Sequence, residues 1–114
     1  MPSPGVYNQV VPQSTTYQFA TKIQTDGVPW NLTNYIAVMT VRPFLGATTT
    51  TLVASTANGK ITLGGTAGTI TVNLSAEDTT LKAQPYVYDL MLDSGSVITR
   101  ALEGQFIVTA GVTV

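Results

Sequence analysis

The sequence contains no cysteine and no histidine. Without cysteine the fold cannot use disulfide bonds or a thiolate metal site. A chain of 114 residues needs neither, because it buries roughly two-thirds of its unfolded surface in one core. Without histidine, the usual zinc ligand, general base and pH switch near neutrality are missing. We therefore expect no cofactor, no metal site and no enzymatic activity.

Charged residues are also scarce, at 10% of the chain, with five basic and six acidic side chains. They are scattered and form no basic run, so the electrostatic footprint of a nucleic-acid-binding protein is absent. A surface so poor in charge is unusual for a freely diffusing monomer and suits a chain that neighbours partly cover. We expect protein partners, including other copies of the chain, and no nucleic acid.

Long apolar runs are missing as well. No run approaches the ~18–20 residues that span a bilayer, and the N-terminus lacks the charged-then-apolar order of a secretory signal. We therefore expect no membrane partner and a chain that begins at or near Met1.

Alternating β-forming residues dominate what is present, and threonine is the commonest residue. Residues 85–93 alternate strictly, which places Tyr86, Tyr88, Leu90 and Leu92 on one face of a strand. A turn around Gly95 and a return strand follow. This hairpin has a large apolar face that requires a second sheet to cover it.

Further alternation and turn spacing predict an antiparallel β-sandwich of seven or so short strands. Asn58-Gly59 predicts a hairpin that pairs residues 52–54 with residues 60–63. The other strands are expected at residues 16–23, 35–42 and 69–74.

Three smaller features are expected around these strands. Residues 75–81 predict one or two helical turns, because Ser75 can cap a helix and two acids follow in its first turn. Gly104 predicts a bulge or bend in the last long strand. Val112 and Val114 predict a final edge strand.

Residues 1–15 contain three prolines and no charge, so they predict an extended arm before a sandwich domain at residues 16–114. Composition alone also fits a disordered leader, whereas Val6, Tyr7, Val10 and Val11 favour packing. We expect the domain to be complete without the arm. The arm would then lie across a neighbouring subunit or add a strand to a partner's sheet edge.

Trp30 is the second candidate contact residue. It follows an Asp26-Gly27 turn in a loop, where an apolar side chain either plugs the end of the core or binds a partner. The candidate partner-binding residues are therefore Val6, Tyr7, Val10, Val11 and Trp30.

Possible catalytic and metal sites have simpler explanations. Gly64, Gly65 and Gly68 are not followed by the lysine or helix of a phosphate loop. Asp89 and Asp93 would lie about 13 Å apart along a strand, too far for a shared carboxylate site. No histidine is present to activate a serine.

The order of several phrases resembles the immunoglobulin-like N-terminal domain of upper baseplate proteins in tailed bacteriophages. In that family a loop containing glycine, proline and leucine precedes an arginine-ended strand. A glycine often precedes the tyrosine strand, where this sequence has Gln84-Pro85. The resemblance covers about residues 22–103. Its phrases are DGVPWNLT (26–33), YIAVMTVRP (35–43), GKITL (59–63), GTITVNLSA (68–76), LKAQPYVYDL (81–90) and ITRALEG (98–104).

The resemblance implies an all-β, immunoglobulin-like antiparallel β-sandwich of about seven or eight short strands with one short helical turn. It also implies a non-enzymatic structural protein located in the virion. Such a protein is an adaptor that joins tail or baseplate to fibres and contacts other virion proteins. Two alternatives stay open: a decoration or cement protein of the phage capsid, and a carbohydrate- or cell-surface-binding module.

Overall fold

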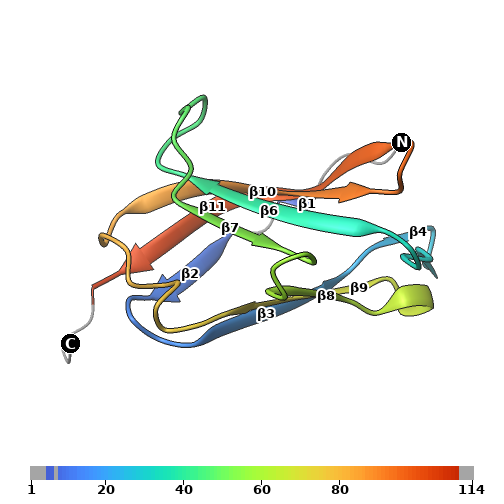
Figure 1. Cartoon of the computed structure of the whole chain (residues 1–114), viewed down its shortest axis with the longest axis horizontal. Coiled ribbons are helices and arrows are strands. Elements are labelled where there is room, and N and C mark those ends of the chain that lie inside the picture. Colours follow the sequence, from blue (N-terminus) through green and yellow to red (C-terminus); the bar gives the residue numbers. More distant parts are fainter. Residues whose placement is uncertain (1–4, 7, 111–114) are drawn as a thin grey trace.

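The computed structural model describes residues 5, 6 and 8–110, which form two β-sheets packed face to face (Figure 1). The larger sheet holds β1 (Gly5–Val6), β2 (Gln9–Pro12), β6 (Ile36–Arg42), β7 (Leu52–Ser55), β10 (Pro85–Asp93) and β11 (Ile98–Thr109). The smaller sheet holds β3 (Tyr17–Lys22), β8 (Ile61–Leu63) and β9 (Thr69–Leu74). A separate ribbon pairs β4 (Gln24–Thr25) with β5 (Val28–Pro29). No helix in this described part is long and apolar enough to cross a membrane.

The connections confirm the predicted immunoglobulin-like sandwich. The larger sheet runs β1-β11-β10-β6-β7, and the smaller runs β3-β9-β8. Neighbouring strands in the chain form hairpins at β6–β7, β8–β9 and β10–β11, while the chain changes sheets after β2, β3, β7 and β9. This alternation of hairpins and crossings is the Greek-key pattern of immunoglobulin domains.

The core lies between the sheets, and its strand faces are as the alternation predicts. In β10, Tyr86, Tyr88, Leu90 and Leu92 are buried, while the residues between them face outward. The ring of Tyr88 lies 6.5 Å from that of Phe19 in the opposite sheet and 6.4 Å from that of Phe106. The Tyr88–Phe19 contact joins the two sheets of a chain that has no cysteine, and the Tyr88–Phe106 contact links neighbouring strands of the larger sheet.

Tyr86 fixes the crossing from β9 to β10. Its hydroxyl donates a hydrogen bond to the carbonyl oxygen of Lys82, four residues upstream, at 2.8 Å. This geometry at the start of β10 matches the tyrosine corner of immunoglobulin domains. Burial raises the pKa of Tyr86, so the hydroxyl keeps the proton that the bond requires.

The expected helix at residues 75–81 is a turn instead. Ser75 and Asp78 do form a reciprocal cap, with N–H to oxygen distances of 3.2 and 3.0 Å. The turn then stops because Thr79 bonds elsewhere: its carbonyl accepts from Ser14 N–H, and its hydroxyl donates to Thr15 O. The one helical turn that the structure describes is the 3-10 element η1 (Gly65–Ala67), between β8 and β9.

The Asn58-Gly59 turn does not form the predicted hairpin. β7 pairs with β6, and β8 pairs with β9, so this turn carries the chain from one sheet to the other. Gly59 has the expected positive φ of 81°, but the Asn58 carboxamide oxygen accepts from the N–H groups of both Ser55 and Lys60. These bonds complete a local turn, and the strands on either side of it, β7 and β8, belong to different sheets.

The bulge in the last hairpin also lies elsewhere than expected. Gly104 is paired regularly with Tyr88, whereas the register shifts between Leu90 and Met91, leaving Ala101 opposite no residue of β10. The expected edge strand at Val112 and Val114 lies outside the described residues.

The N-terminal segment is extended, as predicted, but it belongs to the larger sheet. β1 and β2 both pair in parallel with β11. Val11 is fully buried in the core, and Gln9 is buried with its side-chain oxygen accepting from the Tyr17 hydroxyl at 2.6 Å. Because Val11 fills an inward position, the core is not complete without residues 9–12, contrary to the expectation from proline content.

Candidate protein-binding site

The structure separates the residues that the sequence suggests as partner contacts. Val10 is 55% exposed at the edge of the larger sheet, and its neighbour Val11 is buried, so Val11 cannot contact a partner in this fold. Val6 is placed in β1, and Tyr7 lies outside the described residues. Trp30 is half-buried and packs against the core just after β5. The β4 strand that pairs with β5 lies at the opposite end of the molecule from β2 (Figure 1). These residues do not form one site.

A groove on the outer face of the larger sheet is the best-formed candidate site. It has a volume of about 480 Å³ and lies beneath the loop of residues 43–51, which projects from the sandwich between β6 and β7 (Figure 1). Outward-facing residues of β6, β10 and β11 form its floor. The residues that carry its chemistry are Arg42, Phe44, Leu45, Val87, Asp89 and Arg100.

Local sequence makes the 43–51 loop stand away from the sheet. Pro43 follows the last residue of β6, and a turn then closes through a hydrogen bond of 3.0 Å from Ala47 N–H to Phe44 O. Gly46 has φ of 85° in the third position of this turn, which a type II turn requires and which L side chains rarely adopt. The sequence therefore specifies a tight apolar tip.

Arg42 holds the loop in place from below. Its guanidinium group donates to the carbonyl oxygens of Ala47 and Thr49, at 3.2 and 3.4 Å. Both bonds come from one guanidinium nitrogen, Nη1, so a single group of the side chain holds two loop carbonyls at once. The loop is thus tied to β6 at two points beyond its own turn.

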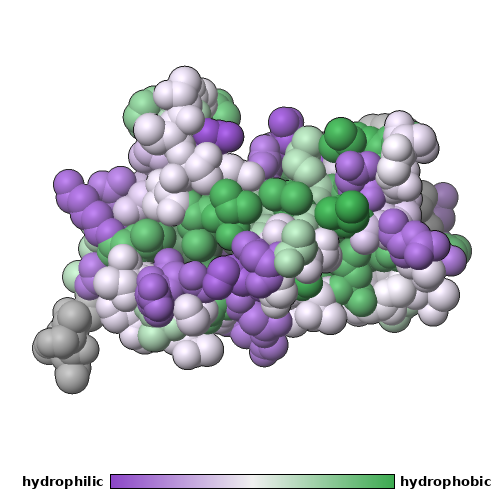
Figure 2. All heavy atoms as spheres, viewed as in Figure 1, coloured by the Kyte–Doolittle hydropathy of each residue, from purple (hydrophilic) through white to green (hydrophobic). Residues whose placement is uncertain are grey.

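The tip that Arg42 supports is apolar and accessible. Phe44 is 63% exposed and Leu45 is 90% exposed. Figure 2 shows hydrophobic surface on this projecting loop and a longer hydrophobic band between the margins of the two sheets. Apolar side chains grouped on a supported loop, beside a hollow, are typical of protein-contact sites.

The groove floor carries charges of both signs. Arg100 lies 3.4 Å from Asp89 in an exposed ion pair, and Asp89 is directly opposite Glu103 in the neighbouring strand. Arg42 adds a second cation at the loop end. The floor is therefore near neutral overall, which suits a polypeptide segment with polar groups better than a polyanion.

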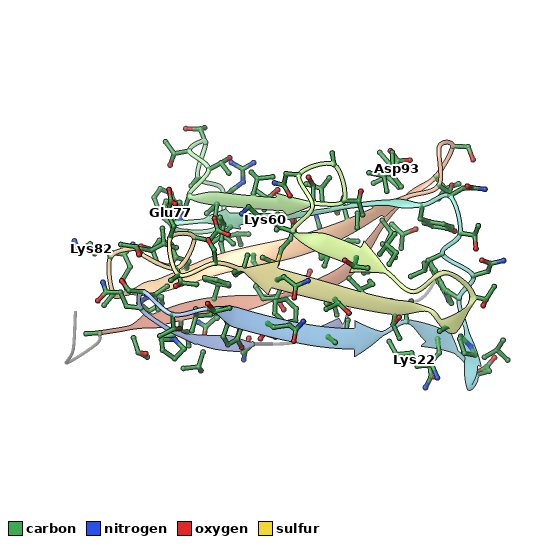
Figure 3. The ribbon with its side chains drawn as sticks, turned by 60° about the horizontal axis from the view of Figure 1, so that its bottom comes forward. Lys22, Lys60, Glu77, Lys82 and Asp93 are labelled. Carbon is green, nitrogen blue, oxygen red and sulfur yellow. The ribbon has the colours of Figure 1, made fainter. Side chains whose placement is uncertain are left out.

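The remaining charged side chains are dispersed. Figure 3 shows Lys22 and Asp93 near one end of the molecule and Glu77 and Lys82 near the other. Among the described residues, no group of three or more aspartate, glutamate, histidine or cysteine side chains is placed to hold a metal ion.

Lys60 and Asp78 form the closest ion pair in the described part of the chain, with Nζ and Oδ2 2.6 Å apart. Burial acts to raise the pKa of Asp78, but the hydrogen bonds from Lys60 and Ser75 and the charge of Lys60 together outweigh it. The pKa of Asp78 is therefore below its usual 3.8. This pair joins the start of β8 to the turn after β9 and has a structural role.

Sequence reasoning did not select Arg42, Phe44 or Leu45 for the site. One signal was available: Phe44 and Leu45 are two large apolar residues between Pro43 and a turn glycine, where no alternating strand can bury them. No comparable pattern in the sequence marks the groove floor, because the floor combines residues of β6, β10 and β11 that are far apart in the chain.

The chain was also compared with known proteins. No model of a known protein family matches it, and no curated protein matches it significantly.

Proposed function

We propose that the protein is a non-enzymatic structural component of a tailed-bacteriophage virion. It acts as an adaptor between tail or baseplate and fibres, through protein–protein contacts. The phage assignment rests on the resemblance of the sequence phrases between residues 22 and 103. The contact role rests on one structural observation: the groove beneath a braced loop whose tip exposes Phe44 and Leu45.

The groove suits a segment of a neighbouring protein that carries an apolar side chain next to polar groups. The apolar side chain would contact Phe44, Leu45 and Val87, and the polar groups would meet Arg42 or the Asp89–Arg100 pair. Such contacts place most of the binding energy in a few apolar anchors, with charges that set the orientation of the partner.

The aromatic residues favour this role over sugar binding. Of the aromatic side chains that the structure describes, Phe44 alone is exposed, while the others are buried or half-buried. Carbohydrate recognition commonly uses several exposed rings, and the described surface does not group them. Capsid cementing would use the same contact chemistry at another place in the particle.

The test is attachment to particles. The full chain is incubated with particles of its phage assembled without it, which are then pelleted. Leu45→Asp should reduce co-sedimentation on the order of tenfold or more, because it places a charge at an apolar anchor. Val28→Asp is the matched control, because Val28 is 66% exposed and belongs to the β4–β5 ribbon, away from the groove.

Equal binding of Leu45→Asp and the unmodified chain would show that the groove is not the contact site. Failure of the unmodified chain to bind any particle component would contradict the virion role itself.

A further inference from the structure

Gln18, Ala20 and Lys22 form the outer edge of β3 in the smaller sheet, and no other described strand pairs with this edge. β3 pairs with β9 on one side and is the first strand of its sheet (Figure 3, blue arrow). At six residues it is long enough to accept a partner strand. It contains no proline, and its one charged side chain, Lys22, stands at its end. Natural proteins usually protect such an edge with charge, proline or a bulge.

The backbone bonds show which groups point out of this edge. Ile23 N–H donates to Gly68 O at 2.8 Å, toward β9. Because backbone groups alternate along a strand, those of Tyr17, Phe19 and Thr21 also face β9. The N–H and C=O groups of Gln18, Ala20 and Lys22 face away, and within the described residues no hydrogen bond satisfies them. This edge therefore presents three backbone N–H donors and three C=O acceptors in a row.

The β7 edge of the larger sheet differs from the β3 edge, because other groups of the fold bond to its backbone. There the Asn58 side chain accepts from Ser55 N–H and donates to Val53 O, and Lys60 N–H donates to Ser55 O. Most outward backbone groups of β7 therefore have partners within the fold. At the other margin, β2 is four residues long and ends in Pro12, which lacks a donor.

We propose that a second copy of the chain binds the β3 edge, with its own β3 running antiparallel about a two-fold axis at Ala20. In this register Ala20 of each copy exchanges both backbone hydrogen bonds with Ala20 of the other. Gln18 lies opposite Lys22 of the second copy, so no like charges face each other. The two smaller sheets become one continuous six-stranded sheet. This dimer does not depend on the groove or on the virion assignment.

Single-cysteine variants test the register, because the chain has no other cysteine. Hydrogen-bonded antiparallel partners have Cα atoms about 5.5 Å apart, within the range of a disulfide. Ala20→Cys should therefore form a disulfide-linked dimer on mild oxidation. Thr62→Cys is the matched control: Thr62 is exposed in the same cross-strand row, but on β8 at the opposite edge of the sheet. It should stay monomeric on a denaturing gel.

Light scattering of the unmodified chain at millimolar concentration should give twice the 12.0 kDa chain mass. Ala20→Pro should give a single chain mass with an unchanged far-UV circular dichroism spectrum, because the N–H that proline removes points away from β9. Gln18→Ala should keep the dimer, because the pairing uses backbone groups. A monomeric unmodified chain, an assembly larger than a dimer, or equal cross-linking of both cysteine variants would overturn the proposal.

Discussion

Tyr86 shows how one hydroxyl can fix a connection between sheets. Its hydrogen bond to Lys82 O holds the segment that connects β9 to β10 against the start of β10. Tyr86→Phe keeps the buried ring but leaves that carbonyl without its donor. We expect a loss of about 1–2 kcal/mol in the free energy of unfolding, measured by urea denaturation. A change within a few tenths of a kcal/mol would show that the corner does not hold the crossing.

Asp78 gives the fold a defined dependence on pH. Its folded-state pKa is lowered, so the unfolded chain takes up a proton at a higher pH than the folded chain does. The stabilisation is therefore fully present above the unfolded pKa, near 3.8, and is lost as the pH falls through the folded value. Melting midpoints measured across acidic pH should show this loss.

Asp78→Asn is the control for that measurement. It keeps an oxygen that can accept from Ser75 N–H but carries no titrating charge toward Lys60. The variant should be less stable at neutral pH and should lose less stability on acidification. An unchanged acid profile in Asp78→Asn would contradict the role assigned to the ion pair.

At the scale of the element, β2 ties the N-terminal segment to the core. Val11→Ala removes a fully buried side chain and should cost about 1.5–3 kcal/mol in the free energy of unfolding. Val10→Ala, at the adjacent and exposed position, should change it by less than about 0.5 kcal/mol. Similar effects of the two substitutions would contradict the pairing register of β2 with β11.

The 43–51 loop is expected to depend on Arg42 for its rigidity. Arg42→Lys keeps the charge but removes the guanidinium group whose Nη1 donates to Ala47 O and Thr49 O. Hydrogen exchange at the Ala47 amide should accelerate roughly tenfold, as the loss of one to two hydrogen bonds implies. The amide of Val72 in β9 should exchange at an unchanged rate. Unaltered protection at Ala47 would show that the turn holds itself.

The sequence predicts those elements whose signal is local. Alternation in β9 and β10 assigns each side chain to a face correctly, because a strand's faces follow from its own residues. Asn58-Gly59 indicates a turn correctly but not its destination, because turn residues fix local φ and not the sheet that the next strand joins. Proline content likewise cannot reveal that β2 pairs with β11, at the other end of the chain.

The groove lies beyond sequence reasoning for the same reason. It exists because Arg42 reaches into the following loop while β10 and β11 bring Asp89 and Arg100 beneath it. The sequence shows Phe44 and Leu45 as two large apolar residues between a proline and a turn glycine. Their place at the rim of the groove depends on residues of other strands, which only the folded chain brings near them.

At the scale of the whole molecule, a low-charge sandwich has a groove on one sheet and, on the other, a strand edge that pairs with no other described strand. Both features fit a chain that is surrounded by neighbours in an assembly. The two sites lie on different sheets, so one copy can bind a partner through the groove while it pairs with a second copy through β3.

The most direct measurement of the proposed virion role is a cryo-electron microscopy map of the phage particle, at a resolution that shows strands. We predict density for this sandwich at the tail or baseplate, with the 43–51 loop inserted against a neighbouring protein. A particle that lacks the chain, or a particle in which that loop faces solvent in every copy, would contradict this prediction.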